Sequence, residues 1–139
     1  MAGIFISYRR QESTKDARSL YERLRGEFGR EGVFIDLEGL DYGVDFVESL
    51  GRQLEGCQVL LALIGPHWLT AKDARGRRRI DDENDFVRIE VRTALDRGIR
   101  VVPVLIDGAP MPVTEELPAD LQRLVRLQAL DLDFKRFDQ

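Results

Sequence analysis

The stretch VLLALIGP, residues 59–66, decides the fold of this chain. Its first six residues are apolar without interruption, which predicts a strand that is covered on both faces. Gly65 and Pro66 then end the run, because neither residue favours the interior of a strand. Strands covered on both faces are typical of a parallel sheet that lies between two layers of helices.

Similar apolar runs lie before and after this stretch. We predict strands at residues 4–7, 33–35, 59–64 and 101–106, and a weaker fifth strand at 128–132. Apolar residues recur at helical spacing between them, which predicts helices at 17–28, 46–57, 85–95 and 121–125, with Phe28 in the core. Pro103 cannot donate a backbone hydrogen bond, so it favours an edge or a bulge in the fourth strand. The alternation predicts an α/β fold with a five-stranded parallel sheet flanked by helices on both faces.

The composition is that of one soluble domain over residues 1–139. A chain of 139 residues is long enough for a real core, and its content of 43% hydrophobic and 33% charged residues is that of a soluble globular protein. Its net charge of −4 argues against nucleic-acid binding, and the basic run at 75–79 precedes an acidic run at 81–83, which predicts a solvated loop. No apolar stretch approaches the roughly 20 residues of a membrane span, so we expect a cytoplasmic protein that does not bind membranes.

Several common site types are excluded by what the chain lacks. Cys57 and His67 are each the only residue of their kind, which excludes an internal disulfide and a multi-cysteine or histidine-rich metal site. Neither a GxGxxG nor a GxxxxGK[ST] motif is present, so a dinucleotide-binding fingerprint and a P-loop are not supported. A phosphoacceptor receiver domain would need acidic residues where Arg9, Arg10, Gly65 and Pro66 stand.

Ligands of open parallel sheets bind at the carboxyl ends of the strands. The polar or aromatic residues that follow the predicted strands are Tyr8, Arg9, Arg10, Asp36, His67, Trp68 and Asp107. Arg9 and Arg10 could meet a pyrophosphate or pair with acidic side chains. Asp36 could cap the turn after its strand or shape the loop that follows. We interpret Trp68 as a packing residue at the rim and His67 as an exposed turn residue.

Glu90 has an unusual place on the predicted helix at 85–95. At about 100° per residue, Val87, Val91 and Ala94 form an apolar stripe, and Glu90 falls on its flank, one turn after Phe86. An unpaired buried carboxylate is costly, so such a residue is usually paired or serves a site. Pairing with Arg9, Arg10 or Arg97 and a functional role both remain open.

Five segments together resemble the Toll/interleukin-1 receptor (TIR) domain, in order and over essentially the whole chain. They are residues 5–10, 34–43, 84–95, 102–108 and 117–121. The segment that contains Glu90 resembles the helix of NAD⁺-cleaving bacterial TIR domains and of the animal NADase of axon degeneration. The resemblance implies a flavodoxin-like TIR fold. It also implies a domain excised from a longer protein, because the family's last helix is cut short at residues 134–139.

The resemblance also implies roles for individual residues. Glu90 falls on the catalytic glutamate, and Phe86 on the aromatic position before it, where some relatives carry Trp. Tyr8, Arg9 and Arg10 would line the substrate cleft, and Asp36 and Phe46 would bracket the loop that covers it. That loop, the BB loop of the family, consists of Leu37, Glu38, Gly39, Leu40, Asp41, Tyr42 and Gly43. NAD⁺ would be the substrate, with no cofactor and no metal.

The family resemblance leaves the activity open in two respects. Nicotinamide leaves NAD⁺ as a neutral group, so one fixed carboxylate that stabilises the ribosyl cation could suffice, and either hydrolysis or cyclisation could follow. A TIR domain can instead be a non-catalytic interaction module, and another flavodoxin-like binding domain is a third alternative. The resemblance also implies homo-oligomers with TIR–TIR contacts, a fused sensor or oligomerising module, and a role in bacterial immunity or host manipulation.

Overall fold

A computed structural model describes residues 3–35 and 46–132, without the side chains of Arg30, Phe46 and Val47. Five parallel strands form one sheet in the order β2-β1-β3-β4-β5. They are β1 (Gly3–Ser7), β2 (Val33–Ile35), β3 (Cys57–Ile64), β4 (Arg100–Ile106) and β5 (Leu130–Leu132). The predicted five-stranded parallel sheet is therefore confirmed.

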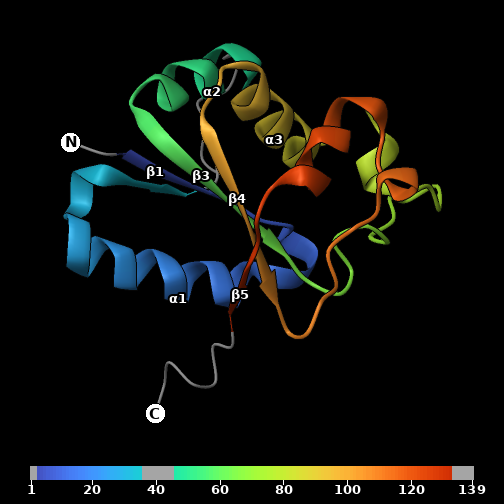
Figure 1. Cartoon of the computed structure of the whole chain (residues 1–139), viewed down its shortest axis with the longest axis horizontal. Helices are drawn as coiled ribbons and strands as arrows, with labels where there is room; N and C mark the ends of the chain where they lie inside the picture. The colour runs from blue at the N-terminus through green and yellow to red at the C-terminus, as the bar shows by residue number, and fades with distance from the viewer. Residues whose placement is uncertain (1–2, 36–45, 133–139) are drawn as a thin grey trace.

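Helices cover both faces of the sheet (Figure 1). The α-helices are α1 (Arg10–Phe28), α2 (Phe46–Glu55) and α3 (Phe86–Asp96). The 3-10 helices are η1 (Arg30–Gly32), η2 (Arg79–Asp81), η3 (Thr114–Glu116) and η4 (Ala119–Arg126), so the helix predicted at 121–125 is of the tighter kind. In Figure 1, α1 lies on one side of the sheet and α2 and α3 lie on the other.

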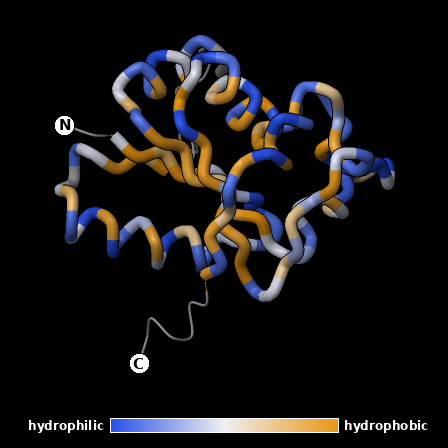
Figure 2. Tube along the Cα trace, in the orientation of Figure 1, coloured by the Kyte–Doolittle hydropathy of each residue, from blue (hydrophilic) through white to orange (hydrophobic). Residues whose placement is uncertain are grey.

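Alternate residues of the strands enter two separate cores. Phe5 packs with α2 and α3, whereas the next residue, Ile6, packs with α1. In β3, Leu60 belongs to the first core and Leu63 to the second, and both are fully buried. Figure 2 shows the resulting concentration of hydrophobic residues along the strands. The uninterrupted apolar run is thus explained by burial on both faces.

Two details depart from the sequence prediction or refine it. Phe28 is the last residue of α1 and is 52% exposed, so it is not part of the core, contrary to the sequence prediction. Pro103 lies in a strand with neighbours on both sides, but β5 begins to pair only at Val104. Pro103 is paired with Ala62 of β3 and has no partner on β5 among the described residues. Its missing N–H therefore interrupts no hydrogen bond between β4 and β5.

The single cysteine lies at the start of β3. Cys57 is buried, and its thiol donates to the backbone oxygen of Gln53 on α2 at 3.5 Å. Burial raises the pKa of the Cys57 thiol to about 11. Within the described ranges, no helix combines the length and the apolar character needed to cross a bilayer.

The order of the strands reverses between β1 and β3. The chain runs from β1 outward to β2 and then returns to place β3 on the other side of β1. Open parallel sheets bind ligands where the order reverses in this way, at the carboxyl ends of the strands. A ligand site is therefore expected among the residues that follow β1 and β3 and at the start of α3.

Candidate active site at the start of α3

Glu90 lies on α3 and is buried, with 2% of its surface exposed. The hydroxyl of Ser7, the last residue of β1, donates to Glu90 Oε1 at 2.8 Å, and Ser7 is itself 1% exposed. The sequence placed Glu90 only on the flank of the apolar stripe, so its burial exceeds the prediction. Of the expected partners, Arg9 pairs with Asp85, and Arg97 lies 3.9 Å from Glu55.

Asp85 joins the same region to the end of β1. Its carboxylate accepts from the backbone N–H of Arg88 at 3.2 Å, which caps the N-terminus of α3. The other oxygen of Asp85 accepts from Arg9 Nη1 at 2.5 Å, and the two side chains are 7% and 2% exposed. The sequence analysis includes Asp85 as the first residue of the helix at 85–95 and gives it no role, although an aspartate at a helix start is a common N-cap signal.

A small pocket of about 60 Å³ lies beside these contacts. Its lining residues are Tyr8, Arg9, Arg10, Gln11, Arg79, Asp85, Phe86, Val87 and Glu90. The structure thus brings together Glu90, Phe86 and the three residues after β1 that the sequence singled out. Asp36 and the loop Leu37–Gly43 lie outside the described residues, as does the side chain of Phe46.

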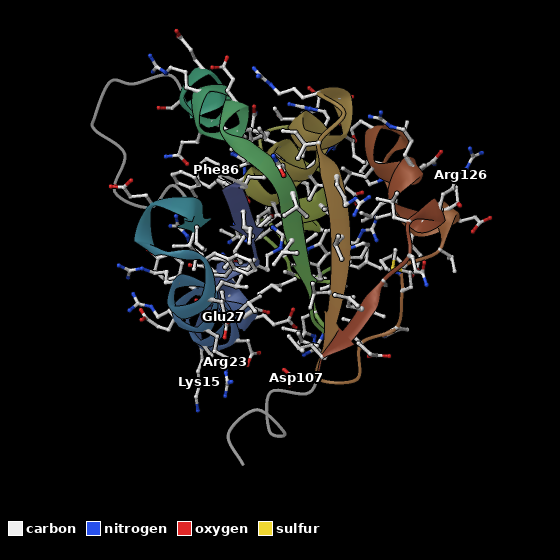
Figure 3. All side chains as sticks on the ribbon, turned by 60° about the vertical axis from the view of Figure 1, so that its left-hand side comes forward. Lys15, Arg23, Glu27, Phe86, Asp107 and Arg126 are labelled. Atoms are coloured by element: carbon white, nitrogen blue, oxygen red, sulfur yellow. The ribbon has the colours of Figure 1, made fainter. Side chains whose placement is uncertain are left out.

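Phe86 is an aromatic residue that the core does not cover. It is the first residue of α3 (labelled in Figure 3) and is 50% exposed. It lines the pocket together with Glu90. The next residue, Val87, is 4% exposed, so the helix buries one side of its first turn and presents the other. An exposed aromatic face beside a buried carboxylate is suited to contact a planar ring.

Arg79 is a lining residue that the sequence analysis missed. It belongs to the basic run at 75–79, which was interpreted as a solvated loop. That interpretation fits Arg77, which is 66% exposed and lies 3.4 Å from Asp73. Arg78 is half-buried, but its guanidinium is occupied by Asp81 and by the backbone oxygen of Glu116, each at 2.9 Å. Arg79, which is also half-buried, differs because it lines the pocket that contains Glu90.

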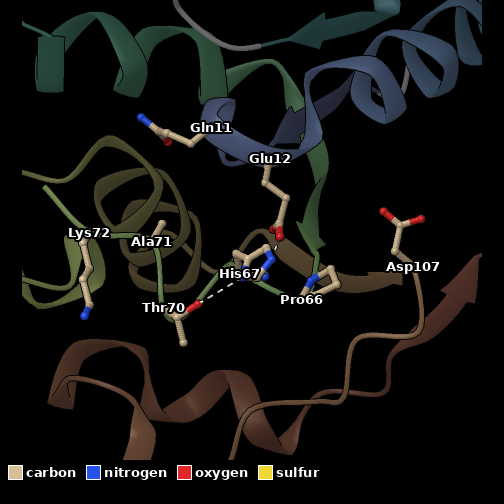
Figure 4. A pocket seen from close by; sticks show the side chains of 8 residues that line it. All are labelled: Gln11, Glu12, Pro66, His67, Thr70, Ala71, Lys72 and Asp107. Carbon is tan, nitrogen blue, oxygen red and sulfur yellow. Dashed lines mark hydrogen bonds between the residues drawn. The ribbon is translucent and has the colours of Figure 1, made fainter.

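A larger pocket of about 570 Å³ lies at the same edge of the sheet (Figure 4). Its lining includes Glu12, which accepts a hydrogen bond from the backbone N–H of His67 at 2.5 Å. Gly65 makes this contact possible, because a Cβ there would lie 2.5 Å from Glu12 Oε1. His67 is exposed, as predicted, whereas Trp68 is 1% exposed and belongs to the core. Gln11 lines both pockets, so the two adjoin at the start of α1.

Metal ligands are not concentrated anywhere in the part of the chain that the structure describes. Among residues 3–35 and 46–132, no group of three or more His, Cys, Asp or Glu side chains could hold an ion. The chemistry that the small pocket offers comes from two carboxylates, of which Asp85 is paired with Arg9, one exposed aromatic ring and three arginines.

The fold and the pocket define the class of this protein, a flavodoxin-like α/β domain with a candidate ligand site at the carboxyl edge of its sheet. The chain belongs to the TIR domain family, whose model matches residues 4–139. It is also similar to the NAD(+) hydrolase sarm1 of Drosophila melanogaster, with 27% identity over 132 residues. That similarity covers 92% of this chain but only 9% of the length of the relative.

Solved structures support the fold. The TIR domains of the activated Roq1 resistosome, which directly recognises the pathogen effector XopQ, superpose with a TM-score of 0.59 at 14% identity. The match covers 99% of this chain and 71% of that one. A metazoan TIR-STING receptor from C. gigas in complex with 2',3'-cGAMP gives a TM-score of 0.56 at 17% identity, over 95% of this chain and 35% of that chain.

The hydrogen bond from Ser7 to Glu90 can be tested by its effect on stability. Ser7→Ala removes a buried donor to a buried carboxylate and should lower the free energy of unfolding by about 1–3 kcal/mol. Ser13→Ala is the matched control, because Ser13 is equally buried but its hydroxyl makes no hydrogen bond to the described residues. Urea unfolding of both variants measures the difference, and equal losses would show that the Ser7 contact is not stabilising.

Proposed function

We propose that this chain cleaves the nicotinamide–ribose bond of NAD⁺ and releases nicotinamide, with ADP-ribose or a cyclic ADP-ribose as the second product. The observation that carries the proposal is Glu90, a carboxylate that is withdrawn from water, fixed by Ser7, and located at a pocket with an exposed aromatic ring. The similarity to a protein named as an NAD(+) hydrolase supports the same activity.

The chemistry needs few groups. The nicotinamide of NAD⁺ is cationic and leaves as a neutral base, so the leaving group needs no proton donor. The bond breaks with both electrons going to the nicotinamide nitrogen, and positive charge develops on the ribose. A carboxylate held in a fixed position near that ribose stabilises the developing charge, and it does so more strongly where water is excluded. Water or the adenine ring of the same molecule then captures the ribosyl cation.

The pocket beside Glu90 is too small to enclose a whole dinucleotide. Ligand pockets usually measure roughly 300–1,000 Å³, whereas the volume beside Glu90 is about 60 Å³. Most of a dinucleotide would therefore lie outside the described pocket. We propose that Asp36, Phe46 and the loop Leu37–Gly43 cover the substrate, and that a second copy of the chain completes the site. The resistosome and receptor named among the structural relatives are consistent with TIR–TIR assembly.

A non-catalytic interaction module is the alternative. Such a module has no evident need for a buried carboxylate, which is costly to fold and useful to a reaction. Bacterial immunity or host manipulation remains a prediction of the sequence resemblance.

The proposed role of Glu90 predicts the loss of NAD⁺ cleavage in Glu90→Gln. This variant keeps the size of the side chain and an acceptor for Ser7 but removes the charge, so the rate should fall by roughly 10²–10³. Nicotinamide release at high protein concentration is the measurement. Glu27→Gln, on the exposed last turn of α1, is the control for preparation effects (Figure 3). Equal nicotinamide release by the wild type and Glu90→Gln would show that Glu90 is not catalytic.

Phe86 is expected to contact the nicotinamide or its ribose. Phe86→Ala should lower kcat/KM for NAD⁺ about two- to tenfold, since aromatic contacts contribute roughly 0.5–1.5 kcal/mol beyond area burial. Phe28→Ala is a matched control, because Phe28 and Phe86 are 52% and 50% exposed and each loses a ring of the same size. If both variants lose stability alike and keep full activity per folded molecule, Phe86 is only a surface residue.

Completion of the site by a second copy predicts that specific activity depends on concentration. Nicotinamide release per molecule should rise as the protein is concentrated, because dilution separates the copies. Activity is measured over a wide dilution series, together with the mass of the species in solution. Constant specific activity across the series would show that one chain forms the whole site.

A further inference from the structure

Arg79 is the one arginine of its basic run whose charge is turned toward the candidate active site. Its side chain is half-buried and lines the pocket that contains Glu90. Its Nε atom is fully buried and makes no hydrogen bond to any residue that the structure describes. A guanidinium that is partly withdrawn from water without a partner loses hydration and gains nothing in return. Such a group is well placed to receive a ligand.

The backbone around Arg79 is held rigidly relative to Glu90. The N–H of Arg79 donates to the oxygen of Ala71 at 2.8 Å, and the next residue, Ile80, is fully buried. Arg88, on the same helix as Glu90, donates to the backbone oxygens of Ile80 and Asp81 at 3.4 and 3.0 Å. These contacts tie η2 to α3, so the base of the Arg79 side chain is fixed beside the pocket.

The charges of the pocket favour an anion. Three arginines (Arg9, Arg10 and Arg79) and two carboxylates (Asp85 and Glu90) line it, which leaves a formal charge of +1. Arg9 is 2% exposed and its Nη1 is paired with Asp85, although its Nε and Nη2 make no hydrogen bond to the described residues. Arg79 is only half-buried, so its guanidinium is the more accessible of the two to a ligand that enters from solvent. A guanidinium binds phosphate through parallel N–H groups, which gives both strength and orientation.

We propose that Arg79 binds a phosphate group of the substrate and makes the site selective for phosphate-bearing nicotinamide compounds over nicotinamide riboside. The proposal rests on the proposed function, since it concerns the same pocket. The pocket volume of about 60 Å³ leaves room for one small polar group of the substrate. Arg79 is a specificity residue in this scheme, and Glu90 acts on the ribose.

The first test compares substrates. Arg79→Gln should lower kcat/KM about ten- to hundredfold for NAD⁺ and for nicotinamide mononucleotide, mainly through KM, because a charge-assisted hydrogen bond to phosphate is lost. Cleavage of nicotinamide riboside, which has no phosphate, should be unchanged. Arg79→Lys keeps the charge but loses the paired N–H groups of the guanidinium. Its kcat/KM for the phosphate-bearing substrates should therefore lie between those of the wild type and Arg79→Gln. Arg77→Gln, on the same loop and 66% exposed, is the matched control and should behave as the wild type.

The second test measures binding without catalysis. ADP-ribose, titrated calorimetrically into the wild type and Arg79→Gln, should bind the variant at least tenfold more weakly, whereas adenosine should show no difference between them. If NAD⁺ is not cleaved but ADP-ribose binding depends on Arg79, the proposed activity fails and the phosphate site stands. If NAD⁺ is cleaved and Arg79→Gln matches Arg77→Gln on every substrate, the phosphate site fails and the activity stands. No measurable binding of ADP-ribose to the wild type would also overturn the role of Arg79.

Discussion

A carboxylate that is withdrawn from water has to be held by donors, and the end of β1 supplies one to Glu90 at 2.8 Å. Two residues further on, Arg9 pairs with Asp85 at the first turn of the same helix. Two buried polar contacts therefore join β1 to α3 where the order of strands reverses. The helix cannot slide along the sheet without separating both pairs, so the positions of Phe86 and of the pocket depend on them.

This arrangement is costly to fold. Desolvation opposes every buried ion pair, and apolar side chains of similar volume often stabilise a core at least as well. Loss of one partner of the Arg9–Asp85 pair would leave the other charged and buried, which typically costs about 3–5 kcal/mol. Arg88 and Arg92 add contacts from α3 to Asp120 on η4, at 3.1 and 3.5 Å, on the more exposed side of the helix. Three of the four buried polar side chains among the described residues, Ser7, Arg9 and Glu90, take part in the contacts beside the candidate site, as expected where function outweighs stability.

Much of the fold could be predicted from the sequence because its signals are local. Uninterrupted apolar runs predict strands that are covered on both faces, and the displacement of Glu90 from the exposed side of α3 is visible from periodicity alone. The partners of these residues were not predictable. Ser7 is the last residue of an apolar strand and gives no sign that it meets a helix 83 residues later. Arg79 is one of four arginines in a run of five residues, and only the path of the loop distinguishes it from Arg77 and Arg78.

Chemical modification of the buried Cys57 thiol can report local opening of the structure. The thiolate is the form that reacts with alkylating and oxidising agents, and a pKa of about 11 leaves very little of it at neutral pH. Reaction therefore has to wait until β3 and α2 separate far enough to hydrate the sulfur. With a single cysteine in the chain, the rate of modification follows the free energy of that one opening. Cysteines introduced on the surface can in turn carry probes while Cys57 stays in place.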